Sequence, residues 1–131
     1  MWTKEIVSIL GLSLIGGSLA VIMVGQTSPK AANPLIEQTE YWALPGKADE
    51  VYQWRIHACD VREKLGLPRG RVLRRQGYSD TLPDVIWQIE YPSEAARDQD
   101  LKVREAPEFR AVRDHMNTLI RRFERGFWQP Q

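Results

Sequence analysis

The sequence predicts an α+β domain of about one hundred residues that follows a single membrane-spanning helix. Two observations predict this organisation: residues 6–25 contain no charged side chain, and residues 35–131 alternate between strand-like and helix-like patterns. A chain of 131 residues has room for one domain of ordinary size. We therefore expect an N-terminal transmembrane anchor (or signal segment) at residues 1–25, a linker at 26–34 and the domain at 35–131.

The uncharged run is long enough to cross a bilayer. Twenty helical residues span about 30 Å, which is the thickness of the hydrocarbon core. A cleaved signal peptide is the open alternative, although Pro29 or Lys30 would occupy a position of the cleavage site where small residues are required. The charges that flank the run favour a cytoplasmic N-terminus and a domain outside, which is the periplasm in a bacterium. Membrane lipid is then an expected partner.

Small residues recur along the uncharged run. Packing rather than hydrophobicity drives helix association in lipid, and small side chains let two backbones approach closely. We therefore expect this helix to pack against other transmembrane subunits or its own copy. The residues predicted to make that contact are Gly11, Ser13, Gly16, Gly17, Ser18, Ala20 and Gly25. The linker that follows is polar and contains Pro29 and Pro34, which is typical of a short spacer.

The first half of the domain predicts two strands and a helix. Residues 35–44 are rich in residues that favour strands, and Pro45-Gly46 ends them with a turn. Residues 48–65 predict a helix that ends at Gly66, and residues 71–78 predict a second strand. The apolar stripe of the helix repeats every three or four residues and consists of Val51, Trp54, Ala58, Val61 and Leu65.

The second half predicts a strand, two helical stretches and a last strand. Residues 84–91 alternate clearly between two faces, and Ser93 is a good N-cap for a helix that runs to about residue 105. Pro107 suits the first turn of a third helical stretch, which we end at Thr118. The tail from residue 119 to 128 allows either helix or strand, and we choose a strand. The resulting β-α-β-β-α-(α)-β order is the ferredoxin-like pattern, in which helices cover one sheet face.

Charge and cysteine content exclude some function classes. Lys4, Lys30 and Glu5 precede residue 33, so the domain carries 16 of the 18 basic residues and 16 of the 17 acidic ones. Nucleic-acid binders usually have a basic excess, because neutralisation of phosphates supplies most of their affinity. We therefore expect no nucleic-acid partner. Cys59 is the only cysteine, and we expect it to be a buried apolar side chain.

Three segments resemble the dimeric α/β-barrel superfamily, which includes NIPSNAP-like, EthD-like and antibiotic-biosynthesis-monooxygenase-like domains. They are EYWALPGKADE at 40–50, SDTLPDVIWQIEYPS at 79–93 and PEFRAVRDHM at 107–116. The resemblance implies a ferredoxin-like domain that pairs sheet to sheet as a homodimer. It also implies that a helical histidine could bind haem iron, as in the haem-degrading members. His115 is the candidate for that role, with Trp42 or Trp87 lining a pocket.

Other candidates for chemistry are few. His57 lies off the apolar stripe of its helix, so we expect it to be exposed. Asp80 and Asp84 flank a loop and could act as an acid and base, although aspartate is also common in turns. The sequence contains neither a cysteine pair nor a His-Glu-x-x-His motif, so it predicts no metal site and no cofactor.

Arginines and tryptophans supply the candidate contact residues. Two arginine clusters, at residues 69–75 and 121–125, should fall on or beside the edge strands, where charge discourages aggregation. Contact with lipid headgroups or an acidic partner is the functional alternative. Trp54 and Trp87 should be in the core. The interface candidates are Trp42, Trp128, Arg74, Arg75, Arg121 and Arg122.

These observations favour a membrane-anchored accessory or structural subunit that acts through protein–protein contacts in a larger membrane complex. The alternative is an oxygenase-like enzyme of the barrel type, or a protein that binds haem or another small molecule. An enzyme of that kind would have an apolar pocket between sheet and helices, with His115 or an aspartate facing in.

Overall fold

The computed structural model describes residues 33–131, which contain four strands and three helices. The predicted anchor at residues 1–25, and nearly all of the predicted linker, lie outside the described residues. Within residues 33–131, no helix combines the length and the apolar character that crossing a membrane requires. The order of elements is β1 (Leu35–Ala43), α2 (Ala48–Lys64), β2 (Arg71–Arg74), β3 (Val85–Tyr91), α3 (Glu94–Val103), α4 (Pro107–Asn117) and β4 (Ile120–Trp128).

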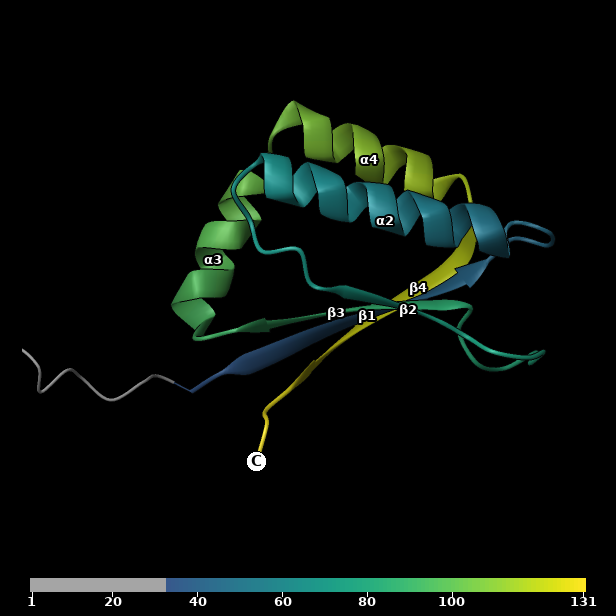
Figure 1. The fold of residues 1–131 in the computed structure, drawn as a ribbon, viewed down its shortest axis with the longest axis horizontal. Coiled ribbons are helices and arrows are strands. Elements are labelled where there is room, and N and C mark those ends of the chain that lie inside the picture. The colour runs from purple at the N-terminus through teal and green to yellow at the C-terminus, as the bar shows by residue number, and fades with distance from the viewer. Residues whose placement is uncertain (1–32) are drawn as a thin grey trace, which may run out of the picture. The chain divides into compact units, whose positions relative to one another are not determined.

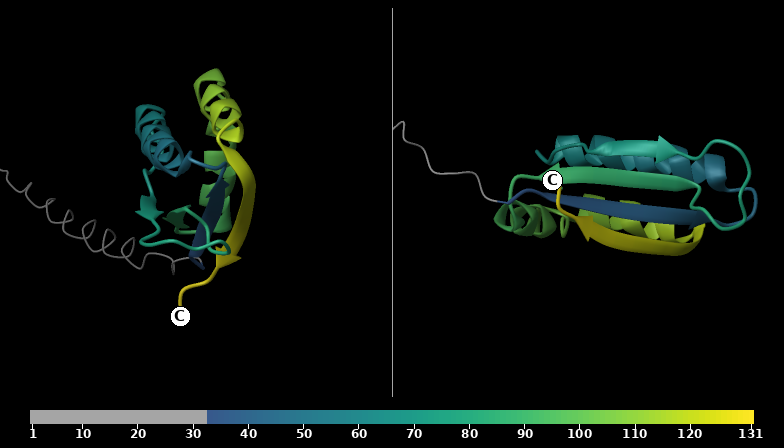
Figure 2. Two further views of the ribbon diagram at one scale, coloured as in Figure 1. Left: turned by 90° about the vertical axis from the view of Figure 1, so that its right-hand side faces the viewer. Right: turned by 90° about the horizontal axis from the view of Figure 1, so that it is seen from below.

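The strands form one antiparallel sheet in the order β2-β3-β1-β4 (Figures 1 and 2). Thr39 of β1 lies opposite Trp87 on one side and Arg125 on the other. Side chains alternate across a pleated sheet, so these three point to the same face. This order and register confirm the predicted ferredoxin-like α+β fold, and they place both arginine-rich strands, β2 and β4, at the sheet edges.

The helices lie on one face of the sheet, and the other face is left without a helix (Figures 1 and 2). Helices α2 and α4 run side by side over the sheet, while α3 lies near one end of it (Figure 1). The core between these layers is apolar and includes Val51, Cys59, Val85, Trp87 and Met116. Cys59 is buried, as predicted.

Most predicted element boundaries agree with the structure within two residues. Ser93 caps α3, because its hydroxyl accepts a hydrogen bond from the Ala96 N–H at 3.1 Å. The tail is a strand, as chosen. One strand is shorter than predicted: β2 ends at Arg74. Its predicted continuation is a loop, in which the side chain of Arg75 binds the Pro83 carbonyl at 3.1 Å and the Asp84 carboxylate at 2.6 Å.

The face that α2 buries differs from the predicted stripe. Trp54, Val61 and Leu65 are only half-buried. The buried side chains of α2 are instead Val51, Arg55, Ala58, Cys59 and Arg62. Val51 and Ala58 belong to both sets, and the centre of the buried face is rotated about the helix axis by roughly 60°. The reason is tertiary: both arginines extend their aliphatic stems along apolar surface and reach groups beneath the helix.

Gly70 lets the chain pass closely beside Trp87. Its φ is +71°, and an added Cβ would lie 2.6 Å from Trp87 Nε1 and 2.7 Å from the Gln88 carbonyl oxygen. Gly77 has a similar φ of +77°, but an added Cβ there would meet nothing within 4 Å. A substitution at Gly77 therefore meets backbone strain alone, whereas one at Gly70 meets both backbone strain and a steric clash.

We expect Gly70→Ala to destabilise the domain by clearly more than Gly77→Ala. The left-handed backbone costs an alanine about 1–2 kcal/mol at either position, and overpacking adds about 1–3 kcal/mol at Gly70 alone. The free energy of unfolding, from urea titration of both variants, measures the difference. Equal losses would contradict the close approach to Trp87.

Candidate functional site

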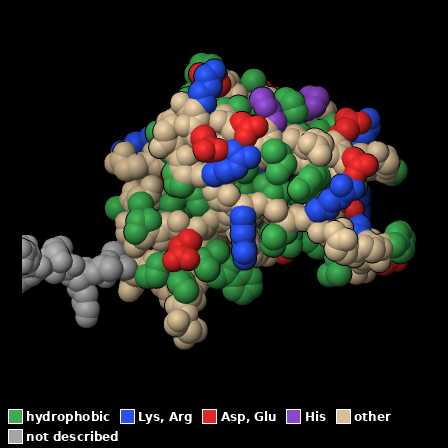
Figure 3. Space-filling view, viewed as in Figure 1, with side chains coloured by type: hydrophobic (Ala, Val, Ile, Leu, Met, Phe, Trp, Pro, Cys, Tyr) green, Lys and Arg blue, Asp and Glu red, His purple; other side chains and the backbone are tan. Residues whose placement is uncertain are grey.

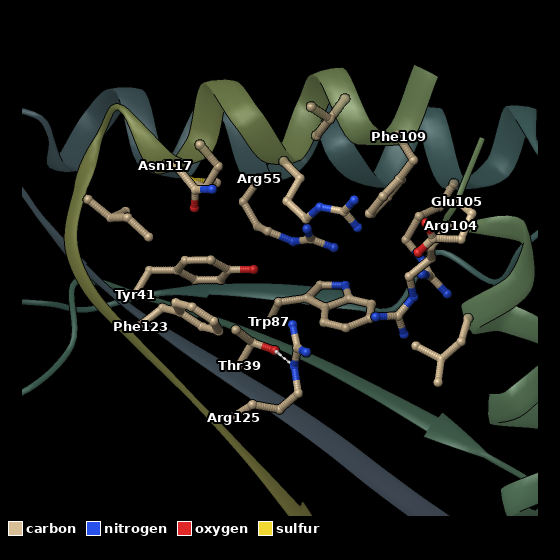
Figure 4. Close-up of a pocket in the computed structure, with 16 residues that line it drawn as sticks. Thr39, Tyr41, Arg55, Trp87, Arg104, Glu105, Phe109, Asn117, Phe123 and Arg125 are labelled. Carbon is tan, nitrogen blue, oxygen red and sulfur yellow. Dashed lines mark hydrogen bonds between the residues drawn. The ribbon is translucent and has the colours of Figure 1, made fainter. Parts of the chain in front are cut away.

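A cavity of about 420 Å³ lies between the helices and the sheet (Figure 4). Its floor consists of two rows of side chains that the strand register sets next to one another. One row contains Trp87, Thr39 and Arg125, and the other contains Tyr41 and Phe123. Helix α4 supplies the roof, with Phe109, Val112 and Met116 facing the cavity. The walls are thus mostly aromatic and aliphatic, which is typical of small-molecule sites.

Trp87 is the central side chain of this floor. It is only 2 % exposed, and its Nε1–H donates to the Arg69 carbonyl at 3.1 Å, which fixes the ring. The guanidinium carbons of Arg55 and Arg62 lie 4.4 Å and 4.9 Å from the centre of the ring. Cations at this range are attracted to the electron-rich face of an indole.

A buried ionic network closes one end of the cavity. Arg62 of α2 makes a bidentate contact with the Asp100 carboxylate of α3, and its Nε donates to the Pro68 carbonyl at 2.7 Å. Arg104 also binds Asp100 and donates to the Tyr91 hydroxyl at 2.6 Å. Burial alone would raise the pKa of Asp100, but the hydrogen bonds and charges of Arg62 and Arg104 outweigh it and lower that pKa.

Glu37 of β1 extends the same network. It is fully buried, and Arg97 Nε donates to its Oε2 at 2.7 Å, while Arg104 and Arg125 lie 3.4 Å and 3.3 Å from its Oε1. Burial opposes ionisation of Glu37, but the charge of Arg104 and the hydrogen bonds of Arg97 and Arg104 prevail and lower its pKa. The ionic network, defined as Glu37, Arg62, Asp100 and Arg104, therefore stays charged at neutral pH.

Arg55 lies beside this network but does not belong to it. The residue is 5 % exposed, and its Nε and Nη2 atoms have no hydrogen-bond acceptor among the described residues. In Figure 4 its side chain descends from α2 into the space above Trp87. Buried donors are nearly always paired in folded proteins, so this orphaned pair marks the cavity as a candidate binding site.

The histidines and aspartates predicted as catalytic candidates lie elsewhere. His115 and His57 are exposed, and both rings stack on Trp54, with ring centres 4.2 Å and 4.6 Å away. They gather on the helical face of the molecule (Figure 3) and line a shallow groove rather than the cavity. Asp84 accepts hydrogen bonds from the Ala43 N–H at 2.9 Å and from Arg75, so it holds the β2–β3 loop. The structure does not bring these residues together.

The predicted interface candidates divide into exposed and covered side chains. Trp128 is 58 % exposed at the end of β4. Trp42 is only 4 % exposed, because Arg122 lies 4.2 Å above its ring and its Nε1–H donates to the Thr81 carbonyl. Arg74 pairs with Asp49, Arg75 holds its loop, and Arg121 is exposed. Trp42 is therefore part of the packed domain and does not extend the exposed face.

Sequence reasoning did not find Arg55 or the ionic network. A signal was present, since Arg55 and Arg62 are seven residues apart and therefore share one face of α2 with Val51. In a sequence, a charged residue next to an apolar stripe is normally assigned to the exposed edge of that stripe, so neither arginine was predicted to be buried. The carboxylate that binds Arg62 belongs to Asp100, which lies far along the chain in α3, and residue spacing does not reveal such a partner.

The comparisons with known proteins establish the fold alone. No family model matches the sequence, and no curated protein is similar to it. Solved structures do match. A NIPSNAP family protein from Agrobacterium tumefaciens has a TM-score of 0.55 and 20% identity, over 79% of this chain and 91% of that one. A proposed antibiotic biosynthesis monooxygenase from Bacteroides thetaiotaomicron has a TM-score of 0.57 and 15% identity, over 75% and 90% of the two chains.

A third match is a dimeric protein from Bacteroides fragilis with a ferredoxin-like fold. Its TM-score is 0.58 at 9% identity, over 77% of this chain and 100% of that one. These likenesses support the predicted ferredoxin-like fold of the described domain. At such low identity they carry no information about which ligand or reaction the cavity serves.

Acid should weaken the ionic network. Because the pKa of Glu37 is lower in the folded state, the unfolded chain takes up the proton first as the pH falls. The stabilisation is complete above the ordinary value of 4.5 and is lost as the pH drops through the folded-state pKa. We expect Glu37→Gln to show a smaller loss of unfolding free energy between pH 6 and pH 3.5 than the unmodified chain, by denaturant titration.

Glu124→Gln is the matched control for that experiment, since the Glu124 side chain is 53% exposed. It should keep the pH dependence of the unmodified chain. A Glu37→Gln variant with an unchanged pH profile would contradict the role of the network.

Proposed function

We propose that the domain binds a small organic molecule in the cavity between α4 and the sheet. The observation that carries the proposal is a volume of about 420 Å³ bordered by aromatic and aliphatic side chains and by several arginines. Ligand sites of proteins typically have this size and composition. The rim includes Asn117, Arg113 and the half-exposed Phe123, so the opening lies between the end of α4 and β4.

A bulky side chain at this rim should block binding. N-phenyl-1-naphthylamine is an uncharged apolar fluorophore that brightens when it leaves water, and it fits a site of this kind. We expect saturable binding to the unmodified chain and at least a roughly tenfold weaker affinity in Asn117→Trp, because the loss of apolar contact area costs about 25 cal/mol per Å².

Asp114→Trp provides the control for that variant. Asp114 is an exposed residue of the same helix that does not line the cavity, so its substitution adds the same indole elsewhere. It should bind the fluorophore normally. If the fluorophore did not bind the unmodified chain, or if both variants bound equally well, the proposal would fail.

We also propose that the helix-free face of the sheet pairs with a second copy of the domain. Strand pairing sets Leu73 and Trp128 on that face, and both side chains are more than one-third exposed. Between these two residues the face carries a hydrogen-bonded polar row that includes Gln38, Gln88 and Arg71. The dimeric Bacteroides fragilis protein has a similar fold, and a sheet face without helices is available for pairing with a second copy.

A charge placed on this face should prevent pairing. We expect Leu73→Glu to convert a dimer to a monomer in sedimentation equilibrium, because pairing would bury the carboxylate without a partner. Ala111→Glu, at an exposed position of α4 on the helical side of the domain, should leave the dimer intact. A monomeric unmodified chain would refute the second copy as the occupant of this face.

The role of an accessory subunit in a membrane complex remains a prediction. It depends on the uncharged run at residues 6–25 and on the small residues within it, which lie outside the described residues. The two proposals above do not depend on it, since a domain on a membrane anchor can bind a ligand equally well.

A further inference from the structure

Arg55 is the buried cation that the domain leaves without a partner. Within residues 33–131, five charged side chains are less than one-tenth exposed: Glu37, Asp100, Arg55, Arg62 and Arg104. Two carboxylates thus face three guanidinium groups. Both carboxylates are already bound by Arg62, Arg97 and Arg104 at hydrogen-bond distance. The remaining positive charge is that of Arg55, and burial of an unpaired charge is strongly unfavourable.

The contact with Trp87 does not satisfy Arg55. The guanidinium carbon lies 4.4 Å from the centre of the indole ring. The electron-rich face of the ring stabilises the positive charge of the guanidinium that lies over it. The N–H bonds of a guanidinium lie within its plane, so stacking leaves them free to bind an acceptor. Nε and Nη2, which have no acceptor among the described residues, form the edge that holds a carboxylate with two parallel hydrogen bonds.

The cavity beside Arg55 has a positive lining. Arg55, Arg62, Arg104, Arg113 and Arg125 border it. Arg62 and Arg104 are already paired with the carboxylates of the ionic network. The uncompensated charge is that of Arg55 and of the exposed Arg113, against the single acidic lining residue Glu105. Because Arg55 borders the cavity, rotation about the terminal bonds of its side chain can turn the Nε–Nη2 edge toward a ligand. The Tyr41 hydroxyl points into the same space (Figure 4) and has no hydrogen bond among residues 33–131, so it is a second donor. An apolar body would fill the rest, against Trp87 and Phe109.

We propose that the ligand is an organic acid, whose carboxylate binds the Nε–Nη2 edge of Arg55 while its apolar body lies against Trp87. The inference rests on the proposed function, because it assigns a chemical class to the molecule in that cavity. It explains in one step the orphaned donors, the excess of buried positive charge and the apolar walls. Arg55 is then the specificity-determining residue of the site.

Competition between two matched compounds tests the proposal. 2-Naphthoate and 2-naphthamide have nearly the same shape and differ in charge. We expect naphthoate to displace N-phenyl-1-naphthylamine from the unmodified chain at a concentration roughly tenfold or more below that of naphthamide, because a hydrogen bond to a charged group has about this effect. In Arg55→Met the preference should disappear, while the uncharged fluorophore still binds.

Arg121→Met is the matched control, since Arg121 is an exposed arginine that does not line the cavity. It should keep the full preference for naphthoate. Equal displacement by the two compounds in the unmodified chain, or a preference that survives Arg55→Met, would overturn the assignment of an acid while the proposed binding function stood. Failure of the fluorophore itself to bind would instead refute the proposed function.

Thermal melting without ligand separates a binding role from a structural one. Arg55→Met removes an unpaired cation, so its melting temperature should equal or exceed that of the unmodified chain. Arg62→Met leaves Asp100 without its bidentate partner and should melt roughly 10 °C lower or more. If Arg55→Met were destabilised as strongly as Arg62→Met, Arg55 would be part of the structural core and the proposal would fail.

Discussion

The described domain depends on the ionic network that joins β1, α2 and α3. Asp100 is the single fully buried residue of α3, and its ion pairs add to the partly buried apolar contacts of Ala96 in attaching this helix to the rest of the domain. Its carboxylate is shared by Arg62 of α2 and by Arg104, and Arg104 in turn reaches Glu37 of β1. Buried ion pairs tolerate little displacement, because any member left alone is an uncompensated charge in a poorly polarisable interior. The network therefore sets the position of α3 at the end of the sheet, and with it one wall of the cavity.

A cavity is a natural consequence of this arrangement. Apolar side chains would collapse to fill the space beneath α2, whereas Arg55 and Arg62 place planar charged groups above Trp87. Arg62 has its carboxylate, and Arg55 does not. The same helix face thus carries Arg62, whose hydrogen-bond donors are paired and stabilise the fold, and Arg55, whose unpaired donors are available to a ligand. The difference between them lies in their partners and not in their sequence surroundings.

The sequence predicted the contacts between residues that are close along the chain, but it did not predict the contacts between distant ones. Local signals were sufficient for Ser93, whose capping contact spans three residues, and for β3, whose alternation is complete. They were misleading for α2, where Arg55 occupies a place on the buried face that an apolar pattern assigns to Trp54. The site could not be predicted because the contacts of Glu37 with Arg97 and Arg104 join residues 60 and 67 positions apart. Periodicity reports which side of an element is buried, but not which distant charge it meets there.

The fold and the ligand are therefore separate questions for this protein. Proteins with 9% to 20% identity have a similar fold, so this fold tolerates very different side chains. The strand register still fixes where side chains at positions such as Thr39, Trp87 and Arg125 must point. What the cavity binds is then decided by the chemistry placed at those points. In this chain that chemistry is an aromatic floor below one unpaired guanidinium, and such a combination selects for negative charge at one end of an apolar molecule.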